Sequence, residues 1–230
     1  MTTDIRVPEM YVKELAKSQD YVGLIGLSVG KAEFMNPVIM ERYAQFMQDH
    51  FAYSVMIIAD FPKKYNIMAL RGVTEDVAEK RTEMAGNELR TNLERVTRDF
   101  PTVKVARWRQ FMTPDYEHNL RVMRGAYLQE SEFRNSCDGL VMDFLNIPEN
   151  KARWSSQANP PLEVAKEYVL DELALFLSVP LSFRLPICEI YPGRNEVHER
   201  VQNRDFAFCR DLRLREDRLF MEAYYEPTNT

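Results

Sequence analysis

The chain has 230 residues, of which 45% are hydrophobic, and its formal net charge is −5, from 30 basic and 35 acidic side chains. This composition is typical of a globular protein with a full core, and no stretch approaches the roughly 18 apolar residues that span a bilayer. The acidic balance argues against a protein that coats nucleic acid nonspecifically, but it leaves room for a local basic patch that binds one folded RNA.

The first residues lack the charged-then-apolar layout of a signal peptide, so we expect a cytoplasmic protein. Its three cysteines, Cys137, Cys188 and Cys209, are odd in number and widely spaced, and the three histidines are scattered. These spacings indicate neither a disulfide framework nor a metal site.

Strand-like and helix-like segments alternate along the first half of the chain. In order, we expect a strand at about 21–27, a helix at 37–50, a strand at 53–59, a helix at 74–99 and a strand at 103–106. Asn36-Pro37 has the pattern of an N-cap followed by proline in the first helical turn, and Thr74 is the expected cap of the long helix. The segment Asp60-Phe61-Pro62 ends the second strand.

The second half continues with helices at about 113–133, 136–146 and 159–177, and with a late strand at 185–191. Pro186 weakens that strand or places it near a sheet edge. We interpret the polar stretch 150–161 as a loop within a single domain of residues 1–230, and the tail after 205 is left unassigned. The alternation predicts an α/β fold with a mostly parallel sheet and helices on both faces.

Ser28 lies in Gly26-Leu27-Ser28-Val29-Gly30, directly after the first predicted strand, where ligands bind in sheets of this kind. A serine between glycines can be presented on a tight turn, with room for a reacting carbonyl and with backbone N–H groups facing a developing oxyanion. The pattern is therefore compatible with a nucleophile. The same glycines are also compatible with a simple turn in which Ser28 is a polar surface residue.

A second pattern is Tyr168-Val169-Leu170-Asp171-Glu172, in which Tyr168 and Glu172 lie four residues apart on a predicted helix and share one face. A phenol and a carboxylate placed together suit a primary ammonium group. Considered alone, Tyr168 fits a core aromatic and Glu172 a surface charge better than they fit a binding site. Tyr191, at the exit of the late strand, and Tyr116, early in a helix, are two further candidates.

The long helix at 74–99 has two distinct faces. Its apolar residues Ala85, Leu89, Leu93, Val96 and Phe100 fall within one quarter of the circumference. Nearly opposite lie four basic residues, Lys80, Arg81, Arg95 and Arg98. They form either a phosphate-contacting stripe or a solvated face balanced by partners such as Glu79 and Glu94.

Together these motifs resemble the cyclodipeptide synthases, which join two aminoacyl groups from charged tRNAs into a diketopiperazine. The resemblance covers the chain from about Tyr21 to Pro192. It implies that Ser28 is the acylated nucleophile, that Tyr168 and Glu172 hold the substrate amino group, and that Tyr191 belongs to the catalytic pocket. Tyr116 matches another pocket tyrosine more loosely.

One branch of that family has asparagine where this chain has Lys31, and histidine where it has Pro192. The chain therefore resembles the other branch, and Lys31 is a substrate-side candidate without an assigned role. The resemblance also suggests that Leu24 and Gly26 line the pocket for the first side chain, with Trp108 as a looser candidate. It does not identify the two amino acids that are joined.

The resemblance further implies a Rossmann-like fold similar to the catalytic domain of class I aminoacyl-tRNA synthetases. Motifs of the H-I-G-H and K-M-S-K-S type are missing from the sequence, so the aminoacyl group must arrive already activated. We therefore expect two aminoacyl-tRNAs as substrates, bound in part by the basic stripe, with no cofactor and no metal, and a monomeric enzyme. The implied reaction is a ping-pong acyl transfer through an aminoacyl-serine and a dipeptidyl-serine.

Two other functions remain compatible with the motifs. An α/β serine hydrolase would place an acid and then a histidine after the serine, and His198 is available downstream. Against it, Ser28 follows the first strand, and no His-Gly-Gly-Gly-like segment precedes it. A noncatalytic tRNA-binding module would use the basic stripe and not Ser28.

Overall fold

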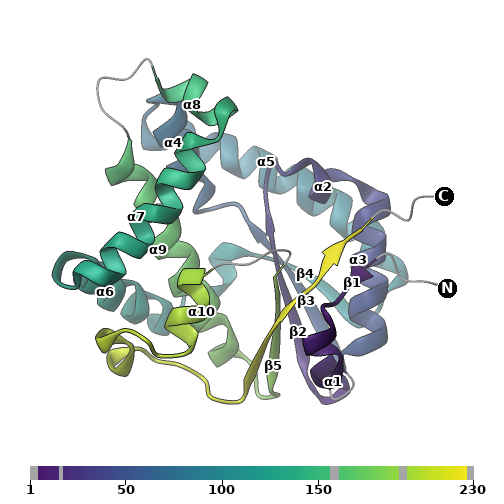
Figure 1. Cartoon of the computed structure of the whole chain (residues 1–230). Coiled ribbons are helices and arrows are strands. Elements are labelled where there is room, and N and C mark those ends of the chain that lie inside the picture. Colours follow the sequence, from purple (N-terminus) through teal and green to yellow (C-terminus); the bar gives the residue numbers. More distant parts are fainter. Residues whose placement is uncertain (1–4, 16–17, 156–160, 192–195, 227–230) are drawn as a thin grey trace.

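The computed structural model describes the chain except for residues 1–4, 16–17, 156–160, 192–195 and 227–230. Within the described residues, five strands form one parallel sheet in the order β4-β3-β2-β5-β6 (Figure 1). These strands are β2 (Val22–Ser28), β3 (Tyr53–Ala59), β4 (Val103–Arg107), β5 (Ile187–Tyr191) and β6 (Arg218–Glu222). A short antiparallel pair, β1 (Ile5–Arg6) with β7 (Tyr224–Tyr225), joins the two ends of the described chain. The predicted α/β class with a parallel sheet is confirmed.

The sheet separates two hydrophobic cores because successive side chains of a strand point to opposite faces. Leu24 and Val55 belong to one core, whereas Ile25 and Met56 belong to the other, and all four are almost fully buried. Parallel strands covered on both faces read as continuous apolar runs, which is why the sequence predicted β2 and β3 to within one residue.

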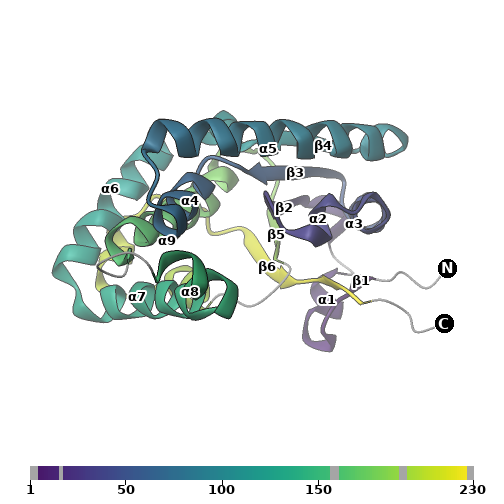
Figure 2. The same cartoon turned by 90° about the horizontal axis from the view of Figure 1, so that it is seen from above.

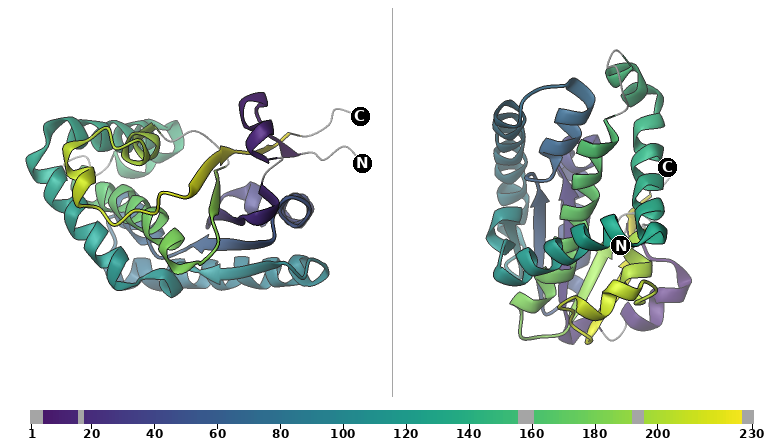
Figure 3. Two further views of the ribbon diagram at one scale, coloured as in Figure 1. Left: turned by 90° about the horizontal axis from the view of Figure 1, so that it is seen from below. Right: turned by 90° about the vertical axis from the view of Figure 1, so that its left-hand side faces the viewer.

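Helices cover both faces of the sheet (Figures 1 and 2). The core on one side includes residues of α3 (Pro37–His50) and of the second half of α5 (Glu75–Val96), next to α2 (Ala32–Met35). The other side is built from α4 (Lys63–Arg71), α6 (Pro114–Gln129), α7 (Ser131–Asn146) and α9 (Leu162–Ser178). Figure 3 shows α6, α7 and α9 as one layer beside the sheet. The remaining helices are α1 (Val12–Leu15), α8 (Pro148–Trp154) and α10 (Glu196–Gln202).

Several predicted boundaries are confirmed and others are wrong. Helix α3 runs over the predicted residues, and the Asn36 side chain accepts a hydrogen bond from the Val38 backbone N–H at 3.0 Å, as an N-cap does. Thr74 occupies the cap position of α5, but its side chain makes no capping hydrogen bond. The break between α6 and α7 lies at Glu130, earlier than predicted, where the backbone is extended.

Two short helices were not predicted from the sequence. Helix α4 follows directly after Asp60-Phe61-Pro62, and α8 occupies part of the stretch 150–161 that was interpreted as a loop. Residues 156–160 of that stretch lie outside the described residues. The tail left unassigned from sequence contains β6.

The late strand, β5, is present and lies next to the edge strand β6 without being an edge strand itself. Pro186 precedes β5 and needs no N–H there, while its carbonyl accepts a hydrogen bond from the Val22 N–H at 2.8 Å. The thiols of Cys137, Cys188 and Cys209 are buried and unpaired. In the described part of the chain, no helix is long and apolar enough to cross a membrane.

Candidate active site

Ser28 is the last residue of β2 and lies opposite Ala59, the last residue of β3. The chain leaves the strand through Gly30, whose φ of +82° is a left-handed conformation that glycine adopts without strain. Lys31 then begins α2 as its N-cap residue. This turn places the Ser28 hydroxyl at the carboxyl edge of the sheet, as the sequence predicted for a nucleophile loop.

The Ser28 hydroxyl lies in a chain of hydrogen bonds that ends on a carboxylate. Ser28 Oγ is 3.2 Å from Tyr168 Oη, and Tyr168 Oη donates to Glu172 Oε1 at 3.1 Å. A phenol has one proton, so when Tyr168 donates to Glu172 its oxygen accepts the proton of Ser28. The spacing of four residues on α9 brings Tyr168 and Glu172 onto one face, and that face is turned toward Ser28.

A narrow cavity of about 30 Å³ opens at Ser28. Its walls come from strand ends and from helices α2 and α9, and its lining residues are Gly26, Ser28, Lys31, Phe34, Ala59, Glu172, Phe176 and Tyr191. Tyr191, the last residue of β5, thus reaches the same site as Ser28 and Glu172. Pro192, the second half of the predicted Tyr-Pro pair, lies outside the described residues.

The close approach of Phe176 explains the first glycine of the serine motif. A Cβ built on Gly26 would lie 2.4 Å from Cζ of Phe176, so a larger residue there would displace the ring. Trp108 packs edge-on against Phe176 with ring centroids 6.2 Å apart. Trp108 and Leu24 are both almost fully buried and do not border the cavity, so they lie behind its wall.

Burial sets the electrostatics of the site. It raises the pKa of Glu172, while the hydrogen bond from Tyr168 and the positive side chains of Lys63 and Lys31 act in the opposite direction. Burial and the nearby Glu172 carboxylate raise the pKa of Tyr168 well above its ordinary value. Tyr168 therefore stays a neutral hydrogen-bond donor and acceptor, and a substrate ammonium group would stabilise the charged form of Glu172.

Tyr116, early in α6, contacts α9. Its hydroxyl donates to the Asp171 carboxylate inside the protein, and its side chain is not among those that border the cavity at Ser28. Burial raises the pKa of both groups. Tyr116 thus fixes α6 to α9 and supports the helix that carries Tyr168 and Glu172.

The four predicted basic residues are Lys80, Arg81 and Arg95 of α5 and Arg98 of the 3₁₀ turn Thr97–Asp99 that follows it. All four are exposed, whereas Leu89 and Leu93 are fully buried. The acidic partners considered for them are engaged elsewhere. Glu79 pairs with Lys64 at 2.9 Å, and Glu94 pairs with Arg90 at 2.6 Å. The basic stripe, as we call these four residues, forms no ion pair with another residue that the structure describes.

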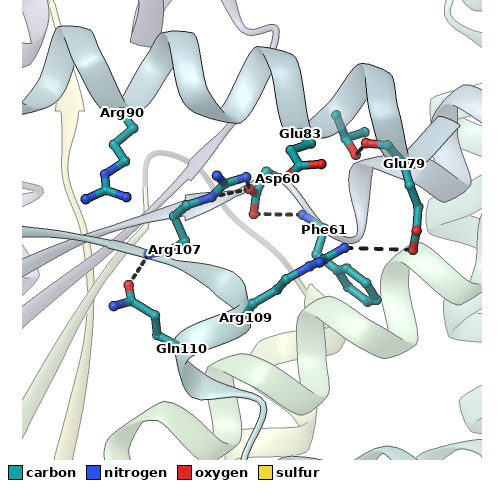
Figure 4. Close-up of a pocket in the computed structure, with 9 residues that line it drawn as sticks. Asp60, Phe61, Glu79, Glu83, Arg90, Arg107, Arg109 and Gln110 are labelled. Carbon is teal, nitrogen blue, oxygen red and sulfur yellow. Dashed lines mark hydrogen bonds and ion pairs between the residues drawn. The ribbon is translucent and has the colours of Figure 1, made fainter. Parts of the chain in front are cut away.

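A further cavity of about 260 Å³ lies between α5 and the ends of β3 and β4 and was not foreseen from the sequence (Figure 4). Asp60, at the end of β3, is 3% exposed and forms an ion pair with Arg107, at the end of β4. The backbone N–H of Arg107 donates a hydrogen bond to Gln110 Oε1 at 2.6 Å. Charged residues directly after two neighbouring strands were the available signal, but Asp60 was interpreted only as a strand terminator.

The family model for cyclodipeptide synthase matches residues 12–213 of this chain. Among solved structures, a cyclodipeptide synthase from Fluoribacter dumoffii superposes with a TM-score of 0.80 at 17% identity, covering 97% of this chain and 99% of that one. A Mycobacterium tuberculosis protein, described as showing that cyclodipeptide synthetases are related to type I tRNA synthetases, gives 0.75 at 16% identity, with 96% and 93% covered.

The cyclodipeptide synthase of Candidatus Glomeribacter gigasporarum, solved bound to Phe-tRNAPhe, gives a TM-score of 0.70 at 12% identity, with 98% and 95% covered. A search of curated protein sequences gave no match. At these identities, the structural matches establish that the fold is shared.

Proposed function

The chain belongs to the cyclodipeptide synthase family, and from that premise we propose that it takes two aminoacyl-tRNAs as substrates and passes both aminoacyl groups through Ser28. It is an enzyme that forms cyclic dipeptides. The observation that carries the proposal is the hydrogen-bonded series of Ser28, Tyr168 and Glu172 at one cavity. This series joins a nucleophile to a site for a primary ammonium group.

In the first transfer, Ser28 Oγ bonds to the carbonyl carbon of the aminoacyl ester, and the bond from that carbon to the tRNA ribose oxygen breaks. The proton lost by Ser28 ends on the released ribose hydroxyl, so the step exchanges one ester for another. Glu172 supplies a negative charge and Tyr168 a directed hydrogen bond to the ammonium group. Together they hold the carbonyl against the serine, which is catalysis by positioning.

In the second transfer, the amine of another aminoacyl-tRNA attacks the acyl-serine carbonyl, which forms an amide and returns the proton to the released Ser28 oxygen. Ser28 Oγ then attacks the ester that joins the dipeptide to this tRNA, and the tRNA leaves with the proton on its ribose hydroxyl. The free amine of the dipeptidyl-serine then attacks its own ester carbonyl, closing the six-membered ring and returning the proton to Ser28. Tyr191 borders the same cavity and is our candidate for relaying protons. Splitting the assembly into sequential transfers is covalent catalysis.

We assign the basic stripe of α5 to the phosphates of the tRNA acceptor arm. Its four side chains are exposed and free of acidic partners among the described residues, which suits phosphate binding. The relative from Candidatus Glomeribacter gigasporarum is a precedent for a tRNA complex on this fold.

The serine hydrolase alternative is not favoured by the geometry. The hydroxyl of Ser28 is hydrogen-bonded to Tyr168, whereas His198 Nε2 lies 2.6 Å from Gln202 and 3.5 Å from Glu189. The His198 ring packs against Phe176 with centroids 5.6 Å apart. His198 therefore belongs to a buried polar group behind the cavity wall.

The proposal is tested with Ser28→Ala and the exposed control Ser155→Ala. Incubation with aminoacyl-tRNA should add one aminoacyl mass to the wild type and to the control, and none to Ser28→Ala, as read by intact-protein mass spectrometry. Expression in a host with its full set of charged tRNAs should yield diketopiperazine masses only from the first two. Full product formation by Ser28→Ala would show that Ser28 is not the nucleophile.

A further inference from the structure

His198, on α10, lies directly behind the wall of the cavity at Ser28. Its side chain is 1% exposed, and its ring packs against Phe176 and Tyr191, with centroids 5.6 and 6.3 Å away. Both of these residues border the cavity, whereas His198 itself does not. An effect of His198 on the reaction must therefore pass through these two rings.

The imidazole is held from behind by the side chains of Gln202 and Glu189. Gln202 Nε2 lies 2.6 Å from His198 Nε2 and donates to Glu189 Oε2 at 2.8 Å. An amide nitrogen donates and does not accept, so the imidazole accepts at Nε2, and the two N–H groups of the amide serve one partner each. His198 and Glu189 are almost fully buried, and hydrogen bonds are stronger where water is excluded. These bonds therefore fix the orientation of the ring.

The ring of Tyr191 belongs to a cluster of four. Besides His198, it packs against Phe176 with centroids 6.0 Å apart and against Phe220 with centroids 6.2 Å apart. Phe220, on β6, also lies 5.4 Å from His198. The four rings come from β5, β6, α9 and α10, and His198 is the member that joins the cluster to the polar groups behind it. Because packed rings prefer particular relative orientations, a change at His198 would be felt at Tyr191.

The strand side of the wall leaves Phe176 little freedom. A Cβ built on Gly26 would lie 2.4 Å from Cζ of Phe176, so the ring already fills the space above that glycine. Close packing on this side and the imidazole on the other hold the wall between them. Loss of the imidazole would open a space behind the wall, and Phe176 and Tyr191 would turn into it.

We propose that His198 is a positioning residue of the reaction, because its ring fixes the Tyr191 hydroxyl at the cavity. Gln202 and Glu189 in turn fix the ring. The inference rests on the proposed function, in which Tyr191 relays protons during acyl transfer. A displacement of about 1 Å can lower a rate up to about 100-fold, so a residue that does not border the cavity can still control kcat.

The test is a double-mutant cycle between His198→Leu and Tyr191→Phe, followed as the steady-state rate of diketopiperazine formation. His198→Leu should lower kcat about tenfold and leave KM for aminoacyl-tRNA within about twofold, because Tyr168 and Glu172 still hold the ammonium group. Tyr191→Phe keeps the ring, removes the hydroxyl and should also lower kcat. In Tyr191→Phe, adding His198→Leu should cost less than about twofold, since the hydroxyl that the imidazole positions is already absent.

Phe208→Leu is the matched control, because Phe208 is buried and packs against Phe133 without bordering the cavity. Any loss that it causes is structural, so it should lower the rate by the same factor in the wild type and in Tyr191→Phe. Gln202→Met leaves the imidazole in place and removes its donor. It should give a loss of about threefold that disappears in Tyr191→Phe, and it decides the question if His198→Leu does not fold.

The inference is overturned if His198→Leu keeps the wild-type kcat, if Tyr191→Phe does so, or if the losses of these two variants multiply as those of the control do. A wild type that gains no aminoacyl mass at Ser28 would instead refute the proposed function. That result comes from the separate mass-spectrometric assay.

Discussion

At the scale of single residues, the carboxyl group of Glu172 is buried, and burial disfavours its charged form. The raised pKa of Glu172 means that the folded protein binds a proton there more tightly than the unfolded chain does. Stability is therefore lost as the pH rises through the folded-state pKa, and the full cost is present above it. In the proposed complex, a substrate ammonium group beside Glu172 would remove this cost.

Replacing Glu172 with glutamine should therefore stabilise the free protein and impair catalysis. Glutamine keeps an oxygen for the Tyr168 hydroxyl but removes the buried charge, so the melting temperature at neutral pH should rise. The gain should vanish below the ordinary glutamate pKa of 4.5, where the wild-type side chain is protonated in both states. Loss of the bond to the ammonium group should lower kcat/KM roughly 10- to 100-fold.

Calorimetry at several pH values measures the melting temperature, and a product assay measures kcat/KM. Glu216→Gln is the matched control, because its carboxylate is exposed and paired only with exposed Arg204. Such a pair contributes little, so the control should change neither quantity appreciably. A lower melting temperature for Glu172→Gln at neutral pH would contradict the electrostatic account.

At the scale of elements, a glycine decides how α5 lies on the sheet. A Cβ built on Gly86 would be 2.7 Å from Asp60 Oδ2 and 3.0 Å from Arg107 Nη2. The ion pair between the ends of β3 and β4 thus occupies the space that a side chain would need. Gly125, on α6, has nothing within 4 Å of the same constructed atom.

The two glycines should therefore respond in opposite directions to alanine. Gly125→Ala should stabilise the protein by up to about 1 kcal/mol, because alanine is the better helix former. Gly86→Ala gains the same propensity but must push apart a buried ion pair, so we expect a net loss of about 1–3 kcal/mol. Urea unfolding of both variants measures the difference. A Gly86→Ala protein as stable as Gly125→Ala would mean that α5 is not fixed by this contact.

The elements also show where sequence reasoning stops. The apolar runs of β2 and β3 predict buried strands, and the spacing of Tyr168 and Glu172 predicts a shared helix face, because both are local patterns. Helices α4 and α8 are short and polar, and they are stabilised by packing against neighbouring helices. Contacts between distant segments, such as Asp60 with Arg107, have no local signature.

The same limit applies within the site. The candidates Ser28, Tyr168, Glu172 and Tyr191 come from motifs that can be recognised in the sequence. Trp108 and Tyr116 were associated with the pocket by resemblance. The contacts of Trp108 with Phe176 and of Tyr116 with Asp171 join distant segments, so no local pattern predicts them.

At the scale of the whole molecule, a protein with a net charge of −5 is expected to bind a polyanion. This is possible because phosphates respond to the local field and not to the total charge. The basic stripe lies on one exposed face of α5, and Figure 2 shows α5 along the opposite side of the molecule from α1. Acidic side chains elsewhere would repel the RNA and so restrict it to this face.

The salt dependence of tRNA binding should report this arrangement. Each phosphate contact releases bound counterions, so the logarithm of the binding constant falls with the logarithm of salt concentration by about 0.9 per contact on a duplex. Replacing Lys80, Arg81, Arg95 and Arg98 with alanine should therefore reduce the slope by about 3 to 4 and weaken binding at low salt. The measurement is a filter-binding titration at several salt concentrations.

The control removes the same amount of positive charge from exposed positions off the stripe, with alanine at Lys13, Arg121, Arg184 and Arg210. If the basic stripe binds the acceptor arm, this control should change the affinity only modestly and leave the slope nearly as in the wild type. The reason is that charges farther from the RNA than a Debye length of about 8 Å are largely screened by salt. Equal losses in both variants would mean that the net charge governs binding. The basic stripe would then be a solvated face and not a binding surface.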